Sequence, residues 1–204
     1  MKQPQGFRRL PRVVQGLLFG FGFLICGSAS AQNLLGNPSF ESPLGPAATN
    51  WTIKYVHGGP DDFAIKDRTT SAATNRPAQY NDRGLHFRPS NEKLMHAYAT
   101  QTISGLQAGH SYSISGRVWG ESPGFNGASG IYRVYFEAIG GQGTARSPDA
   151  PVDPGSSRAI YTITQTPDAD GKIEVRLHMD KFSWCNYDKC VVINGYFDDF
   201  WVLY

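Results

Sequence analysis

The chain has 204 residues, with 19 basic and 17 acidic side chains and a formal net charge of +2. Four of the basic residues and none of the acidic ones lie in residues 1–31, so residues 32–204 carry a net charge of −2. This balance argues against a nucleic-acid partner, and the length suffices for one domain with a hydrophobic core.

Residues 1–31 have the pattern of a secretory signal peptide. The start is basic, with Lys2, Arg8, Arg9 and Arg12. An apolar run follows over 13–26, and residues 29–31 read Ala-Ser-Ala, the small-residue pattern of a cleavage site. We therefore expect cleavage between Ala31 and Gln32 and a secreted or periplasmic protein. The alternative is a membrane anchor, but the run is too short to span a bilayer.

The rest of the chain predicts an all-β domain over residues 32–204. Short runs of alternating polar and apolar residues recur between Gly, Pro, Asn, Asp and Ser, and no useful helical periodicity is present. We expect strands at 33–41, 51–56, 62–66, 84–88, 96–103, 111–119, 131–138, 158–164, 172–179 and 193–204. Strands at this spacing are typical of a two-sheet sandwich or a barrel. The polar stretch 140–157 is predicted to be a loop.

Four of these strands combine an apolar side with a side rich in arginine and aromatic residues. The second side carries His86, Arg88, Ser115, Arg117, Trp119, Arg133, Tyr135, Glu137, Glu174, Arg176 and His178. Arginine makes planar contacts with anionic groups and stacks on rings, and Trp and Tyr offer flat apolar surfaces to sugar rings. The alternative is that Arg and Glu pair across strands only to cover a sheet.

Several segments, in order along the chain, resemble a known family. They are "NLLGNPSFES", "NWT", "QTISGLQAGHSYSISGRVWG", "GKIEVRLHMD" and "YFDDFWVLY". Together they resemble carbohydrate-binding modules of the family 4, 9, 16 and 22 group. The resemblance implies a galactose-binding-like jelly-roll β-sandwich and places the four strands in one sheet. Their second sides would then form one glycan-binding cleft on the concave face.

The resemblance also implies a structural calcium ion between the first and last strands. Its ligands would include Glu41 and either Asp198 or Asp199, and Asp198 is favoured because it shares parity with Phe200 and Val202. A carboxylate that points at apolar neighbours is costly unless a cation or donors satisfy it, and calcium takes several oxygen ligands. The alternative is an aspartate that caps backbone N–H groups.

The segment "DKFSWCNYDKC" contributes two further expectations. In an exported protein, Cys185 and Cys190 are expected to form a small disulfide loop rather than a metal site. Trp184 and Tyr187 lie on this loop, where they would either contact ligand or close one end of the sandwich.

These observations favour a secreted non-catalytic glycan-binding module, with an acidic polysaccharide such as a uronic-acid polymer as the sharper expectation. Two alternatives stay open. One is a polysaccharide lyase that uses Tyr135 or His178 with nearby arginines; the other is an envelope interaction protein without sugar binding. Glu137 and Glu174 would suit a glycosidase, but salt bridges to Arg133 or Arg176 explain them more simply. We expect the protein either to work alone or to have a separate glycan-active enzyme as a partner.

Overall fold

A computed structural model of the chain describes residues 33–40, 50–57, 63–67, 83–87, 94–121, 132–151, 159–182 and 194–204. The chain divides into two units, residues 1–30 and 31–204, and every described residue lies in the second. The predicted signal peptide falls outside the described residues. Within those ranges there is no helix of the length and apolar character needed to cross a bilayer.

The described part of the chain is built from β-strands. They are β1 (Thr52–His57), β2 (Phe63–Asp67), β3 (Arg83–Phe87), β4 (Met95–Ile103), β5 (Tyr112–Glu121), β6 (Tyr132–Gly140), β7 (Gly143–Arg146), β8 (Ala159–Gln165), β9 (Ile173–Lys181) and β10 (Asn194–Leu203). All but β7 match a predicted strand to within two residues at each end, because their alternating pattern is that of a strand with one buried side.

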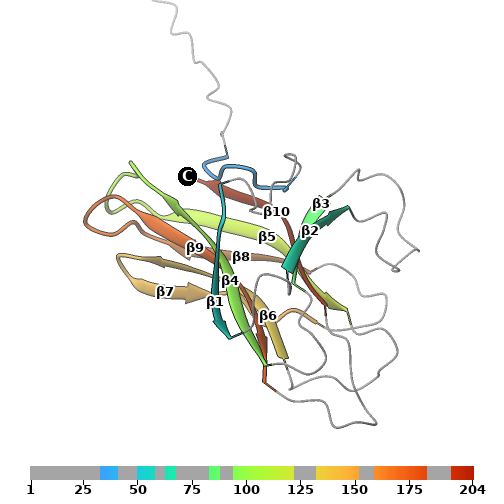
Figure 1. Cartoon of the computed structure of the whole chain (residues 1–204). Helices are drawn as coiled ribbons and strands as arrows, with labels where there is room; N and C mark the ends of the chain where they lie inside the picture. Colours follow the sequence, from blue (N-terminus) through green and yellow to red (C-terminus); the bar gives the residue numbers. More distant parts are fainter. Residues whose placement is uncertain are drawn as a thin grey trace, which may run out of the picture. The chain divides into compact units, whose positions relative to one another are not determined.

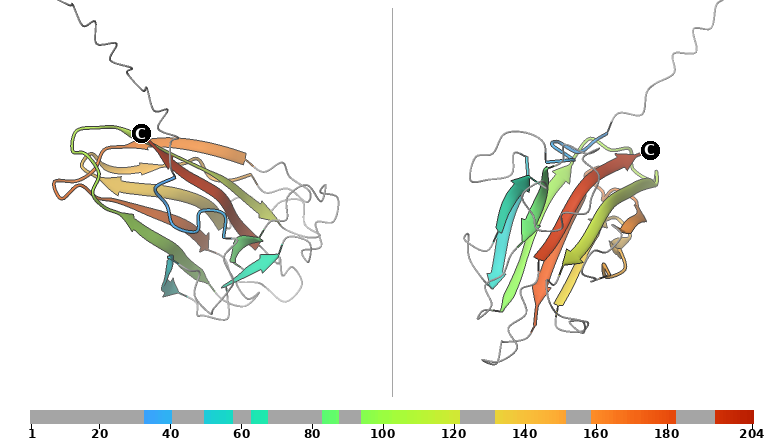
Figure 2. Two further views of the ribbon diagram at one scale, coloured as in Figure 1. Left: turned by 90° about the horizontal axis from the view of Figure 1, so that it is seen from above. Right: turned by 90° about the vertical axis from the view of Figure 1, so that its right-hand side faces the viewer.

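The strands form two five-stranded sheets (Figures 1 and 2). The first has the order β1-β4-β9-β6-β7 and the second β2-β3-β10-β5-β8, and neighbouring strands run antiparallel. The core lies between the sheets, where β9 contributes Ile173, Val175, Leu177 and Met179, all 0% exposed. The predicted all-β, two-sheet sandwich is confirmed.

β7 is the strand that the sequence did not predict, since it lies in the polar stretch expected to be a loop. A turn at 141–142 and Gly143, whose φ is 88°, return the chain antiparallel to β6. The pairing continues beyond β7, because the backbone N–H groups of Ser147 and Ala150 donate to Phe136 and Val134. Backbone hydrogen bonds hold this segment although it has little apolar content.

A strand was predicted at 33–41, and over the described residues 33–40 this prediction is wrong. The segment consists of bends and turns, with Asn37 and Phe40 at positive φ. It lies beside the end of β10 (Figure 1), where the Asn33 amide donates to the Phe200 carbonyl (2.7 Å) and the Asn33 side-chain oxygen accepts from the Val202 N–H (3.0 Å). A side chain therefore replaces the backbone ladder that a strand would make.

A bulge in β10 changes which side of the strand its residues occupy. Asp198 lies opposite Arg117 and Trp201 opposite Ser115, with the irregularity between them and Asp199 at a φ of 46°. Simple alternation would place Phe197 and Phe200 on opposite sides, yet both lie in the core. The extra residue of a bulge resets the alternation in this way.

Candidate functional site

The surface predicted from four strands divides between the two sheets. β6 and β9 are neighbours in the first sheet, whereas β3 and β5 belong to the second. The prediction that these strands share one sheet is therefore wrong, and the single cleft built on it does not form. Alternation defines which side of a strand is buried, but it does not define the strand's neighbours.

On the second sheet, the outward residues are largely covered. Tyr196 stacks between His86 (ring centroids 4.6 Å apart) and Trp119 (4.9 Å), because the three residues lie opposite one another on β10, β3 and β5. Trp119 is 1% exposed and His86 2%. Their rings therefore serve packing on this side of the sandwich and are not presented to solvent as platforms for a sugar.

The first sheet carries the larger group of predicted site residues on its outer side. We call this surface the β4–β9–β6 face. It comprises His96, Tyr98 and Thr100 of β4, Glu174, Arg176, His178 and Asp180 of β9, and Arg133, Tyr135 and Glu137 of β6. The alternate residues of these strands, among them Ala97, Leu177 and Phe136, lie in the core.

A row of stacked rings crosses the β4–β9–β6 face. The His178 ring lies between Tyr98 (centroids 4.9 Å apart) and Tyr135 (4.7 Å, interplanar angle 3°), since all three are direct neighbours in the register. The Arg146 guanidinium continues the row, 3.7 Å from the centroid of the Tyr135 ring. Stacked rings and guanidinium groups hold one another in fixed orientations, so the buried His178 and Tyr135 fix the position of the half-buried Tyr98.

Charged groups flank the row on one side. Arg176 makes two hydrogen bonds to Glu174, at 2.9 and 2.8 Å, and lies 3.6 Å from Glu137. Its guanidinium also lies 5.1 Å from the centroid of the Tyr98 ring. The His178 Nε2 lies 3.1 Å from a Glu137 oxygen. The predicted pairing of the glutamates with an arginine is thus confirmed for Arg176, which pairs with Glu174 and also lies beside Glu137.

A second charged group lies at the β7 side of the face. Arg133 and Arg146 both form ion pairs with Asp149, the first at 3.7 Å. The sequence had suggested that Arg133 could pair with Glu137. In the structure Arg133 pairs with Asp149 instead. Its guanidinium also lies 5.1 Å from the ring of Phe182, which is 51% exposed.

The protonation of these groups does not suit acid–base catalysis. The hydrogen bond from His178 lowers the pKa of Glu137, and the hydrogen bonds from Arg176 lower the pKa of Glu174. A glycosidase acid needs a raised pKa so that it holds a proton at neutral pH. Burial, followed by the nearby charge of Asp180, raises the pKa of Tyr135 to about 12, which makes this residue a poor base. The lyase alternative, which used Tyr135 as one of its proton-transfer groups, is therefore not favoured.

The two aspartates predicted as metal ligands have different surroundings. Asp199 is paired with Arg117, whose Nε lies 2.9 Å from Asp199 Oδ2, so this carboxylate already has a cation beside it. Asp198 is 0% exposed, and its oxygen atoms fit the donor type that calcium prefers. The bulge places Asp198 on the outer side with Tyr196, not with Phe200 and Val202, so the parity argument for it was wrong. The calcium site stays a prediction.

Several predicted residues lie outside the described part of the chain. They are Glu41, Arg88, Trp184, Cys185, Tyr187 and Cys190. The predicted disulfide and the loop contacts therefore stay predictions.

Four residues of this region were not predicted from the sequence. His96 and Tyr98 were missed because strand 96–103 was not used, although it alternates as clearly as the others. Asp180 lies one residue beyond the predicted end of its strand, and Arg146 lies in the predicted loop. The alternation signal was available for the first three, whereas Arg146 is brought to the face only by the pairing of β7 with β6.

The Glu174–Arg176 pair is expected to make stability depend on pH. The folded state lowers the pKa of Glu174 below its ordinary value of 4.5. The Glu174 carboxylate therefore stabilises the fold at pH values above 4.5, and this stabilisation is lost as the pH falls through the pKa of the folded state. We expect Glu174→Gln to lower the free energy of unfolding by about 0.5–1 kcal/mol at pH 7. This difference should shrink in urea titrations at decreasing pH below 4.5.

The matched control is Asp170→Asn, which removes an ion pair to Lys172 at a carboxylate whose side chain is 74% exposed. No measurable loss is expected there, because solvent screens the pair. If the difference in free energy of unfolding between the wild type and Glu174→Gln grew as the pH fell, the lowered pKa assigned to Glu174 would be wrong.

Comparisons with known proteins agree on the fold. No protein-family model and no curated protein sequence matches the chain. A solved family 61 carbohydrate-binding module, TmCBM61 in complex with β-1,4-galactotriose, matches with a TM-score of 0.53 and 14% identity over 85% of this chain and 99% of the module. The enzymatically active domain of tailspike protein 4 of bacteriophage CBA120 matches with a TM-score of 0.53 and 11% identity over 83% of this chain, but over 21% of its own.

A family 4 module matches at a TM-score of 0.49 with 14% identity, over 83% of this chain and 98% of the module. Modules of families 16 and 22 also match, at lower TM-scores. The match to TmCBM61 shows that the chain has the β-sandwich fold of that carbohydrate-binding module, in agreement with the fold that the resemblance implied.

Proposed function

We propose that the protein is a non-catalytic glycan-binding module whose β4–β9–β6 face contacts a poly- or oligosaccharide. The observation that carries the proposal is the half-buried ring of Tyr98, which stacks on the buried His178 and lies beside the Arg176–Glu174 ion pair on the outer side of one sheet. Flat rings pack on the C–H faces of sugars, and fixed polar groups beside them orient hydroxyl groups. The similarity in fold to TmCBM61 supports this reading.

The charges of the face favour a hydroxyl-rich ligand over a polyanion. Arg133, Arg146 and Arg176 each lie within 4 Å of a carboxylate of Asp149, Glu137 or Glu174. Arginine that is already paired offers less attraction to an added carboxylate. Arg117, which contributed to the acidic-ligand expectation, lies on the other sheet. The proposal therefore takes a neutral glycan as the ligand class, and an acidic glycan becomes an outcome of the test.

The proposal also includes export and a structural calcium ion. The basic start and the Ala-Ser-Ala motif before Gln32 support export, and N-terminal sequencing of the exported protein would test it.

The buried Asp198 supports calcium, with Glu41 as the second expected ligand. Thermal melting in calcium and in a chelator would test the ion. A separate glycan-active enzyme remains the partner we propose.

A glycan-array screen, followed by titration calorimetry with xylan, β-1,4-galactan and alginate, tests the glycan proposal. Neutral polymers should bind and alginate should bind more weakly. Stronger binding to alginate than to the neutral polymers would show that the ligand is an acidic glycan. If no glycan on the array bound, the proposal of glycan binding would be wrong.

Tyr98→Ala should weaken glycan binding by about tenfold, since it removes a ring that reaches the solvent side of the row. Titration calorimetry against the best array ligand measures this loss, and thermal melting checks the fold of the variant. Tyr204→Ala is the control, because Tyr204 is 76% exposed and follows β10 of the other sheet. Equal losses in both variants would place the ligand elsewhere.

A further inference from the structure

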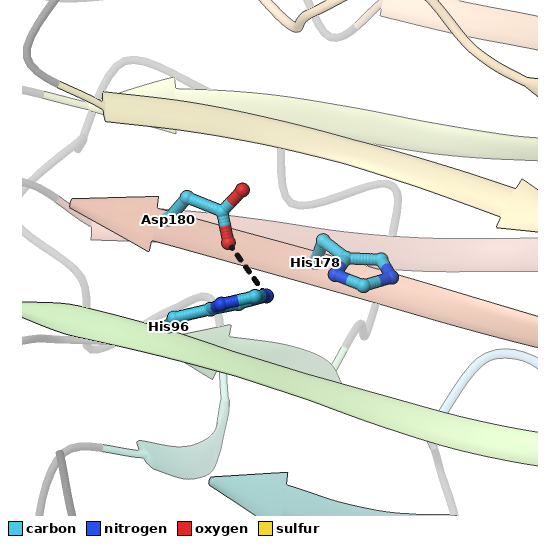
Figure 3. Close-up of side chains that lie close together, drawn as sticks. All are labelled: His96, His178 and Asp180. Carbon is cyan, nitrogen blue, oxygen red and sulfur yellow. Dashed lines mark ion pairs between the residues drawn. The ribbon is translucent and has the colours of Figure 1, made fainter. Parts of the chain in front are cut away.

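His96, His178 and Asp180 bring three metal-ligand side chains together on the β4–β9–β6 face (Figure 3). His96 lies opposite Asp180 in the β4–β9 register, and His178 precedes Asp180 by two residues on the same side of β9. One ligand atom from each residue lies within 4.8 Å of the other two. The His96 Nε2 and the Asp180 Oδ1 are 3.4 Å apart, close to the separation of about 3.3 Å that two ligands of one tetrahedral zinc ion have.

Two of these groups are buried and present an atom without a hydrogen bond. His178 is 4% exposed and Asp180 6%. In the part of the chain that the structure describes, neither His178 Nδ1 nor Asp180 Oδ1 has a hydrogen-bond partner. Buried polar atoms without a hydrogen bond are rare in proteins, and an ion is one of the recognised reasons for them. Asp180 Oδ1 has the half-exposed His96 Nε2 as an ion-pair neighbour at 3.4 Å. Both residues belong to the cluster, so one cation could satisfy both atoms.

The remaining polar atoms of these two residues are held by neighbours. The His178 Nε2 lies 3.1 Å from Glu137 Oε1, so its N–H can donate to that carboxylate. This hydrogen bond leaves the lone pair on Nδ1, the nitrogen in the cluster. The Tyr135 hydroxyl donates to Asp180 Oδ2 at 3.2 Å, which leaves Oδ1 for the cluster. A carboxylate–histidine–metal arrangement is the usual support for an imidazole ligand.

We propose that His96 Nε2, His178 Nδ1 and Asp180 Oδ1 bind a divalent transition-metal ion of the zinc type. Two imidazole nitrogens and one carboxylate oxygen suit zinc and its neighbours in the first transition row, whereas calcium prefers oxygen ligands throughout. The side chain of His96 is 40% exposed, so this ligand can adjust its position. Three protein ligands leave the fourth position of the ion to water or to an oxygen of another molecule.

This site is separate from the calcium expected near Asp198, which lies on the other sheet. It also does not rest on the proposed glycan binding, because its test uses the metal alone.

Zinc binding to the untagged full-length protein, measured by equilibrium dialysis with elemental analysis, tests the proposal. One zinc ion per chain is expected, and cobalt should give the visible absorption of a four-coordinate site. His96→Ala and Asp180→Asn should each weaken zinc binding at least tenfold. Glu137→Gln removes the carboxylate that supports His178, together with its ion pair to Arg176, and should weaken zinc binding tenfold to a hundredfold. His110→Gln is the matched control, since His110 belongs to the exposed pair with Tyr204.

Thermal melting without metal shows whether each variant folds, and zinc should raise the melting temperature of the wild type but not of His96→Ala. The exposed side chain of His96 makes this variant the least disruptive of the three. Absence of zinc binding to the wild type would overturn the proposal. So would zinc binding that is unchanged in both His96→Ala and Asp180→Asn, because the ion would then be held elsewhere.

Discussion

Phe136→Ala should lower the free energy of unfolding by about 3–5 kcal/mol, the range for truncation of a fully buried phenylalanine. Phe136 is 0% exposed in β6 of the first sheet, and its ring meets that of Phe200 in β10 of the second, with centroids 5.1 Å apart at 88°. The pair therefore connects the sheets. Equilibrium urea unfolding, followed by tryptophan fluorescence, measures the loss.

Thr144→Ala is the control for this variant, since Thr144 is exposed on the neighbouring strand β7. Its effect should remain within about 0.5 kcal/mol. If Phe136→Ala cost less than about 1 kcal/mol, the stacking of the two sheets through this contact would be wrong.

Gly116→Ala should lower the free energy of unfolding by about 1–3 kcal/mol, because the core has no room for the added methyl group. A Cβ at this position would lie 2.2–2.4 Å from three atoms of the Phe200 ring. The close approach exists because the β10 bulge places Phe200 on the core side, across from β5. Urea unfolding again provides the measurement.

A double-mutant cycle with Phe200→Leu identifies the cause. If the clash is with the Phe200 ring, the Gly116→Ala substitution should cost less in the Phe200→Leu background, with a coupling of about 0.5–3 kcal/mol. Ser113→Ala, at an exposed position of the same strand, should have little effect. Strict additivity of the two substitutions would show that Phe200 does not occupy the space over Gly116, and the bulge would then be misplaced.

The candidate site shows where prediction from the sequence stopped. Arg133, Tyr135, Glu137, Glu174, Arg176 and His178 were recognised as members of one outward face, and they do share one. His86, Arg117 and Trp119 were joined to them wrongly. The error arose because the alternation of each strand was clear, whereas the order of strands in a sheet depends on contacts between segments far apart in the chain.

The sequence by itself determined the local features of this protein. The period-two alternation of strands such as β9 fixed which side chains enter the core, because a one-residue shift would expose all of them. It also fixed the turn residues and the charge balance. The tertiary structure alone decided that β7 pairs with β6, that a bulge at Asp199 moves Phe200 into the core, and that His96 meets His178 and Asp180. These features depend on register and on contacts between distant segments, and no local pattern of residues encodes either.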